Sequence, residues 1–412
     1  MNYIDLFAGA GGLSEGFIQA GFEPIAHVEM NPDAANTLRT RTCYHYLRHI
    51  GRLNEYRDYE KGQITKEELY SRVPNNILKS IINAEISKET IGKIFARVDK
   101  FLAANPNWGN QVDVIIGGPP CQAYSLVGRA VKDNNMVDDP RNFLYQMYCR
   151  FLSKYTPRMF VFENVPGLLT ANKGYHFKNI KKYMRRVGYE IEARELNASD
   201  FGVLQNRRRI IIVGWRKNSK YCFPDIPKVQ HNYKVSDLFR DLPKLQAGEA
   251  NNQYTCAVRS QYLVDFAIRE NDDVLTWHEA RPHIARDREI YRRTIKLWND
   301  GHQRLKYCDL PDELRTHKNI TAFLDRFKVV EGDTSACHTM MAHISKDGHY
   351  FIHPDLEQAR SITVREAARI QSFPDSYFFE SNRTAAFTQI GNAVPPLMAK
   401  AIAVEIRKLL EN

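Results

Sequence analysis

The sequence predicts an α/β fold built on a parallel sheet, with a second, smaller domain. Residues 3–7 read as a short buried strand, a glycine-rich turn follows at 8–12, and apolar residues then recur at helical spacing up to Gly21. A strand, a glycine turn and a helix in this order are typical of a nucleoside-cofactor site in a parallel sheet. The chain has 412 residues, of which 43% are hydrophobic, enough for one large core and a smaller one.

The next apolar stretch, at 23–30, contains Glu29 near its end. An acid at this point commonly accepts hydrogen bonds from the two hydroxyls of a ribose. The glycine turn lacks the Lys-Ser/Thr pair of a phosphate-binding loop, so the pattern favours a nucleoside without a triphosphate. A glycine turn that serves only packing is the alternative interpretation.

A third strand is expected at 112–116, and Gly-Gly-Pro-Pro-Cys-Gln follows it at 117–122. The two prolines have preset φ angles and fix the backbone before Cys121. The turn therefore decides the direction of the thiol, as the presentation of a nucleophile requires. The alternative is a turn that ends a strand and carries a satisfied core thiol.

Two further apolar strands border charged residues. Glu163 follows the run at 159–162, which is typical of a carboxyl group with a pKa raised by partial burial, although an ordinary strand-end carboxylate is the alternative. Arg207 and Arg209 alternate with their neighbours ahead of the strand at 210–213, which predicts that both point to one face. A solvated charge run is the alternative for these arginines. The last helix is expected at 397–410.

These residues carry a resemblance to the DNA (cytosine-5)-methyltransferases of the prokaryotic restriction–modification type. Six motifs occur in the order of that family across nearly the whole chain, at 5–12, 119–122, 163–165, 205–209, 365–374 and 389–396. The resemblance implies a Rossmann-like S-adenosylmethionine-dependent methyltransferase sheet. Its catalytic domain would span 1–215 and be completed by 360–412, and a smaller target-recognition domain would occupy 216–359.

The resemblance also implies a mechanism for sequence-specific methylation at C5 of a cytosine flipped out of duplex DNA. Cytosine C5 is a poor nucleophile, and addition of the Cys121 thiolate at C6 makes C5 enamine-like. Glu163 would protonate N3, Arg209 would contact O2, and Arg207 would help to orient the base and Glu163. The base that removes the C5 proton is not visible in the sequence. The flip costs a few kcal/mol, which recognition contacts supply.

The cofactor implied by the resemblance is S-adenosyl-L-methionine, and no metal is expected. Met30 stands where the family often has a larger aromatic residue against adenine, and Glu85 stands where it usually has aspartate. The residues expected to bind the cofactor are Phe7, Gly9, Ala10, Gly11, Gly12, Glu29, Met30, Glu85, Ile86, Pro119, Asn392 and Val394. Those expected to contact DNA are Gln122, Ser125, Arg129 and Gln205.

Composition agrees with double-stranded DNA as the partner. The formal charge of +10 and the pI near 9.1 favour a polyanion. No apolar run approaches the length of a membrane span, which excludes a membrane protein of helical type. Seven cysteines without a Cys-x-x-Cys pair fit the reducing cytoplasm and argue against a disulfide framework and structural zinc. We expect a monomer, and a cognate restriction endonuclease that acts separately.

Four segments are less directly tied to the chemistry. Residues 43–80 form a longer excursion, helical at 55–68, to which the sequence assigns no task; 125–141 is expected to be a loop that closes over DNA. Residues 173–186 predict a helix with one basic, solvated face. A hairpin is expected at 338–354, with strands at 339–344 and 349–352.

Two other functions remain open at this point. A tRNA cytosine-5 methyltransferase of the same fold is disfavoured by the long segment between Val213 and Arg360, which suits a reader of DNA sequence. A DNA-binding regulator that has lost turnover is disfavoured because Cys121, Glu163 and Arg209 are all present. The recognition sequence, the base-reading residues in 216–359 and the modified cytosine cannot be read from one chain.

Overall fold

The computed structural model describes residues 1–120, 144–255, 259–321 and 324–412. Its described part contains a seven-stranded sheet in the order β3-β2-β1-β4-β5-β7-β6. Neighbouring strands from β3 to β5 run parallel, whereas β7 is antiparallel to both β5 and β6. The strands are β1 Asn2–Leu6, β2 Glu23–Glu29, β3 Ile81–Asn83, β4 Val114–Gly117, β5 Met159–Asn164, β6 Tyr189–Asn197 and β7 Arg208–Arg216. The predicted α/β class is confirmed.

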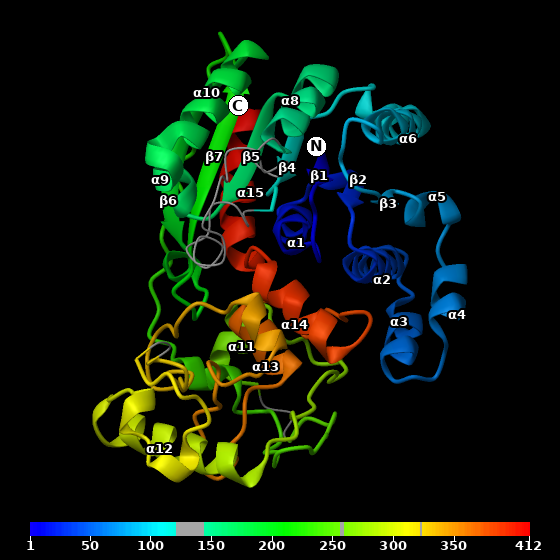
Figure 1. Ribbon diagram of the computed structural model, residues 1–412. Helices are drawn as coiled ribbons and strands as arrows, with labels where there is room; N and C mark the ends of the chain where they lie inside the picture. Colours follow the sequence, from blue (N-terminus) through cyan, green and yellow to red (C-terminus); the bar gives the residue numbers. More distant parts are fainter. Residues whose placement is uncertain (121–143, 256–258, 322–323) are drawn as a thin grey trace.

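Helices cover both faces of this sheet (Figure 1). Side chains alternate across β1, so that Tyr3 joins the core on the side of α1 and α15, whereas Ile4 joins the core on the side of α6, α8 and α10. A strand that is buried on both faces has apolar residues at successive positions, and such runs can be recognised in the sequence. These helices are α1 Gly12–Gln19, α6 Ile91–Ala104, α8 Leu144–Tyr155, α9 Gly167–Thr170, α10 Tyr175–Arg186 and α15 Pro396–Glu411.

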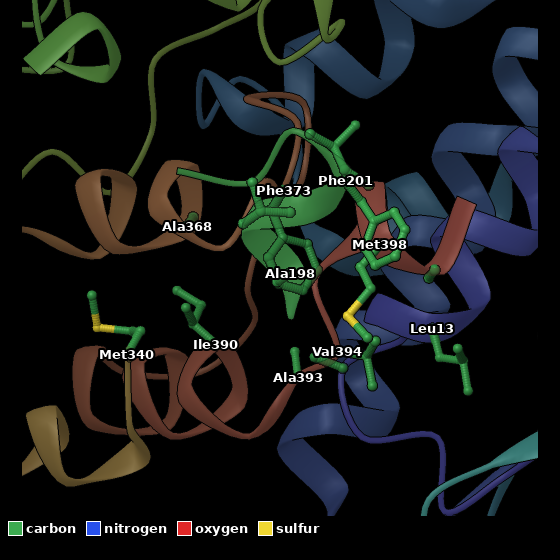
Figure 2. Close-up of a cluster of buried hydrophobic side chains, with 14 of the residues drawn as sticks. Leu13, Ala198, Phe201, Met340, Ala368, Phe373, Ile390, Ala393, Val394 and Met398 are labelled. Carbon is green, nitrogen blue, oxygen red and sulfur yellow. The ribbon is translucent and has the colours of Figure 1, made fainter. Parts of the chain in front are cut away.

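The C-terminal segment returns to the first strand, as expected. Helix α15 packs closely along α1, and Figure 2 shows Val394 and Met398 within the cluster that also contains Leu13 and Phe373. The expected last helix at 397–410 is confirmed, since α15 begins one residue earlier and ends one residue later. Two shorter helices precede it, α13 Val364–Ile370 and α14 Arg383–Asn392.

Most of the described residues between 216 and 359 form a region with little sheet, below the strands in Figure 1. A separate apolar cluster surrounds Tyr291 and Trp298 of α12 (Ala285–Gly301), but Leu238 and Met340 belong to the main cluster of the sheet. The region therefore has a small core and also shares the large one. It also contains α11 Gln261–Asp265.

The predicted hairpin at 338–354 is wrong. The backbone N–H of Met340 donates to the Gln205 side chain, residues 342–345 form a 3-10 helix, and Ile352 makes isolated bridges with Val329 and Ser361. Partners distant in sequence occupy the backbone groups that a local hairpin would have paired.

The excursion at 43–80 is helical, as predicted, and packs against the C-terminal segment. Tyr44, Tyr56 and Leu69 form a small apolar cluster into which Phe378 packs. The Tyr59 hydroxyl donates to Glu380 at 2.8 Å, and Arg48 forms an ion pair with Glu270 at 2.9 Å. The segment thus links the sheet to the region around residue 270. Its helices are α2 Pro32–His49, α3 Leu53–Glu60, α4 Lys66–Ser71 and α5 Asn75–Leu78.

Candidate active site

The glycine turn after β1 is held in a conformation that few residues adopt. Phe7 has a φ of 57°, and Gly9 and Gly11 have φ values of 54° and 84°. A non-glycine residue in the left-handed region is strained, and such strain concentrates at functional sites. A Cβ on Gly9 would meet nothing within 4 Å, so the turn leaves open space on that side. Ala10, by contrast, turns its methyl group into the core.

Glu29 ends β2 beside this turn. Its carboxylate accepts the backbone N–H of Gly9 at 2.7 Å through Oε2 and that of Asn31 at 2.7 Å through Oε1. Burial raises the pKa of Glu29, and these N–H groups partly oppose the shift. The structure therefore places an acceptor at the rim of the glycine turn, as the sequence indicated. Carboxylate oxygens retain further lone pairs for ligand hydroxyls.

Asp5 is a buried acid within the motif at 5–12 that was not among the residues expected to bind the cofactor. It lies on β1 directly before the turn and is 1% exposed, and no described group donates a hydrogen bond to either of its carboxyl oxygens. Burial, with a smaller contribution from Glu29, raises its pKa well above the usual range. An orphaned acid at this position fits a ligand with an ammonium group. The signal in the sequence was an acid inside an apolar strand.

Other residues expected at the cofactor site lie at the same sheet edge. Met30 follows β2 and is 60% exposed, an apolar surface available to a ligand. Glu85 and Ile86 follow β3, the first exposed and the second buried. Asn392 ends α14 and is exposed, and the carbonyl of Val394 would lie only 2.2 Å from a Cβ on Gly12. The C-terminal turn therefore closes directly over the start of α1.

The turn after β4 meets the end of β5. The two strands pair in parallel, with Gly117 opposite Phe162. A Cβ on Gly118 would lie 2.6 Å from the Glu163 carboxylate, so the turn approaches this acid closely. Pro119 is buried next to it. Cys121, Gln122, Ser125 and Arg129 lie outside the described residues, as does the loop expected at 125–141.

Glu163 and Arg209 form the central polar pair of the site. Arg209 Nε lies 2.7 Å from Glu163 Oε1, and each side chain is 14% exposed. The pair results from the antiparallel register of β5 and β7, in which Glu163 lies opposite Ile211. A partly exposed acid and arginine at the end of the sheet can hold a planar group with both donors and acceptors.

Arg207 and Gln205 lie inside the protein. Arg207 is 1% exposed and donates to the carbonyls of Met340 at 2.6 Å and Gly391 at 2.9 Å. The β7 strand begins at Arg208, so the alternation used in the sequence analysis does not extend to Arg207. Its expected part in orienting Glu163 remains a prediction.

The amide of Gln205 is fully buried. It donates to Gln371 Oε1 at 2.6 Å and accepts the Met340 N–H at 2.7 Å. The side chain has no exposed surface with which to meet DNA in this structure, so the expected contact stays a prediction. The structure instead assigns Gln205 a link between the motif at 205–209 and α13.

No cluster of three or more potential metal ligands occurs in the described ranges. Within those ranges, no helix is long and apolar enough to cross a membrane.

The fold and this site define an α/β protein in which a glycine turn and the acid Glu29 lie at the same end of a mainly parallel sheet as an acid–arginine pair. The family model for C-5 cytosine-specific DNA methylases matches residues 1–67 and 76–408. The chain belongs to that family, and it is a DNA (cytosine-5)-methyltransferase.

Curated relatives cover the full chain. It is 40% identical to the type II methyltransferase M.Bpa9945I of Bacillus paralicheniformis, over 100% of both chains. It is 31% identical to M1.HphI of Haemophilus parahaemolyticus, over 100% of this chain and 88% of the relative. Both relatives are described as type II methyltransferases.

A solved structure shares the fold. A prophage-encoded protein described as a DNA modification methyltransferase (E. coli) matches with a TM-score of 0.65 and 24% identity, over 100% of both chains. A methyltransferase of Entamoeba histolytica matches with a TM-score of 0.57 and 14% identity, over 100% of this chain and 99% of the other. At these identities the likeness concerns the fold.

Proposed function

We propose that the enzyme methylates C5 of one cytosine within a short sequence of duplex DNA, through a covalent bond between Cys121 and C6 of the base. The observation that carries the proposal is the Glu163–Arg209 pair, 2.7 Å apart, against which the turn before Cys121 packs at Gly118. The same edge of the sheet carries the glycine turn and Glu29. The acid, the cation and the turn that leads to the expected nucleophile thus belong to one end of the sheet.

The residues present fit S-adenosyl-L-methionine as the cofactor. The open side of Gly9 leaves room for a ligand backbone, the orphaned Asp5 carboxyl suits an ammonium group, and Glu29 offers oxygens to ribose hydroxyls. Met30 supplies an exposed apolar surface for adenine. When bound, this cofactor supplies an electrophilic methyl group attached to a sulfonium.

The chemistry of the chain's own residues is then as follows. The Cys121 thiolate bonds to C6 of a flipped-out cytosine, the C5–C6 π electrons shift towards C5, and Glu163 gives a proton to N3. Arg209 contacts O2 and holds Glu163 in place. After C5 has gained its methyl group, a base removes the C5 proton, the thiolate leaves C6 and the N3 proton returns to Glu163, which restores the aromatic ring and the enzyme.

The division of labour along the chain follows the same proposal. Residues 1–215 and 360–412 form the catalytic unit, and residues 216–359 read the DNA sequence from the major groove. Methylation protects host DNA from a restriction endonuclease that acts separately, and the enzyme works as a monomer in the cytoplasm. Base flipping exposes the target, because C5 and C6 cannot be reached within the stack.

The test is transfer of labelled methyl from S-adenosylmethionine to mixed-sequence duplex DNA, with tRNA assayed in parallel. We expect label in duplex DNA only, and none with Cys121→Ala. The control is Cys222→Ala, which changes an exposed cysteine and should keep full activity. Label in tRNA but not DNA would favour the RNA enzyme. An active Cys121→Ala variant would refute the covalent route, and a folded parent inactive on both substrates would favour a binding-only protein.

A further inference from the structure

The turn between β4 and Cys121 has few hydrogen-bond donors of its own. Pro119 and Pro120 are consecutive, and proline has no backbone N–H. The described part of the turn can therefore be fixed by donors that reach its carbonyl groups from outside. A buried carbonyl without such a donor would be destabilising. A side chain from a neighbouring element must supply the donor.

Asn164, the last residue of β5, supplies it. Its side-chain Nδ2 donates to the Pro119 carbonyl at 3.2 Å, and its Oδ1 accepts the backbone N–H of Val165 at 2.9 Å. Because the carbonyl only accepts and the N–H only donates, these two partners determine the orientation of the amide. Asn164 is 2% exposed, so water does not compete for these bonds.

Consecutive residues of β5 thus contact consecutive residues of one turn. Glu163 lies against Gly118, where an added Cβ would meet its carboxylate at 2.6 Å, and Asn164 bonds Pro119. Cys121 follows Pro119 by two residues in the sequence. The hydrogen bond from Asn164 therefore holds the turn that leads to Cys121 at a fixed distance from Glu163.

We propose that Asn164 is a positioning residue, which holds the proline turn so that Cys121 and Glu163 act on the same base. The inference rests on the proposed function, because it needs Cys121 to be the nucleophile. Asn164 touches neither substrate nor cofactor in this scheme. It acts by removing freedom from a turn in which two consecutive residues, Pro119 and Pro120, have no backbone N–H.

The test uses long duplex DNA synthesised with 5-fluorocytosine in place of cytosine. The thiolate bonds to C6 and the methyl group bonds to C5. C5 then carries fluorine in place of the hydrogen that a base would remove as a proton, so the thiolate cannot leave. The covalent adduct therefore persists and can be counted. Asn164→Asp keeps the shape and replaces the donor by an oxygen that repels the Pro119 carbonyl. We expect adduct formation about 100-fold slower than in the parent, with unchanged affinities for S-adenosylmethionine and DNA.

The pH dependence separates positioning from general damage. In Asn164→Asp, the new carboxyl group can again donate to the Pro119 carbonyl once it is protonated, so the ratio of variant to parent rates should rise as the pH falls from about 8 to about 5.5. Asn164→Ser is too short to reach Pro119 and introduces no charge, so it should slow the reaction without this rescue. Asn75→Asp, the same change at an exposed residue of α5, should match the parent.

The outcomes are distinguishable. An Asn164→Asp enzyme that forms adduct at the parent rate would overturn the inference alone. A ratio that does not change with pH, the same rescue in Asn164→Ser, or loss of cofactor affinity along with the adduct would also overturn it. If the parent itself formed no adduct, the proposed function would fail first.

Discussion

Arg209 Nε lies 2.7 Å from Glu163 Oε1, at the point where β5 and β7 run antiparallel at the end of the sheet. The guanidinium fixes the direction of the carboxyl group and keeps donors beside it. Both side chains remain partly exposed, so a base can reach them. In the proposed mechanism, the pair joins the proton donor Glu163 to Arg209, the group that contacts O2 of the base.

Substitution of either partner should therefore reduce turnover more than cofactor binding. Glu163→Gln keeps the shape and removes the acid, and we expect the methyl-transfer rate to fall by a factor of about 10² to 10⁴. Arg209→Lys keeps the charge and loses the planar fork, so it should also slow transfer. The measurement is single-turnover transfer to duplex DNA. Arg185→Lys, an exposed change on α10, is the control, and equal losses in all three variants would contradict the assignment.

Glu29 should control cofactor affinity. Glu29→Gln removes a carboxylate oxygen that can accept from ribose hydroxyls, and we expect the dissociation constant of S-adenosylmethionine to rise at least about 10-fold. Because burial raises the pKa of Glu29, affinity should be full above that pKa and fall as the pH decreases through it. Calorimetric titration measures both effects. Glu23→Gln, at the other end of β2, should bind normally, and an affinity unchanged in Glu29→Gln would remove this residue from the site.

Two glycines of one turn should respond differently to alanine. A Cβ on Gly12 would lie 2.2 Å from the Val394 carbonyl, so Gly12→Ala should destabilise the protein by about 1–3 kcal/mol. A Cβ on Gly9 meets open space, so Gly9→Ala should lose only the cost of placing alanine at a φ of 54°, about 1–2 kcal/mol, and should in addition weaken cofactor binding. Urea denaturation and cofactor titration of both variants check this. Intact cofactor binding in Gly9→Ala would show that the open space is not a ligand site.

Gln205 distinguishes a packing link from a DNA contact. Gln205→Leu would leave the Met340 N–H and the Gln371 amide without their buried partner, which costs about 1–3 kcal/mol per group. We expect a lower free energy of unfolding, and normal DNA affinity for the molecules that remain folded. Unchanged stability with weaker DNA binding would instead support the contact expected from the sequence.

Stability should depend on pH through buried His27. Its Nε2 lies 2.7 Å from the Ser14 hydroxyl; burial, with a smaller effect of His45, lowers its pKa from 6.5 to about 3. The unfolded chain binds a proton below pH 6.5 while the folded one does not. The free energy of unfolding is therefore unaffected by His27 above pH 6.5, and it decreases by about 1.4 kcal/mol per pH unit as the pH falls from 6.5 towards 3. His27→Gln should show a shallower slope in denaturation at several pH values, and an identical slope would contradict this role.

Elements whose information is local could be predicted from the sequence. The runs around Ile4, Ile116 and Val161 are apolar because both faces of these strands are buried, so their positions were clear. The glycine turn and the strand-end position of Glu163 followed from the same pattern. The turn that precedes Cys121 in the sequence was predicted because two consecutive prolines constrain the backbone by themselves.

What could not be predicted depends on partners distant in the sequence. Thr339 to Ile344 resembled a strand, but Met340 is held by Gln205, and Arg207 bonds Gly391 across the same core. No periodicity within a segment encodes such pairs. The same holds for Asn164, whose partner Pro119 lies on the neighbouring strand's turn.

The central claim is tested most directly by base-resolution sequencing of 5-methylcytosine in DNA from a methylation-free host that expresses the chain, beside the Cys121→Ala variant. We expect one short sequence motif to be methylated throughout the genome by the parent and not by the variant. A host genome without 5-methylcytosine, despite well-folded parent protein, would contradict the claim.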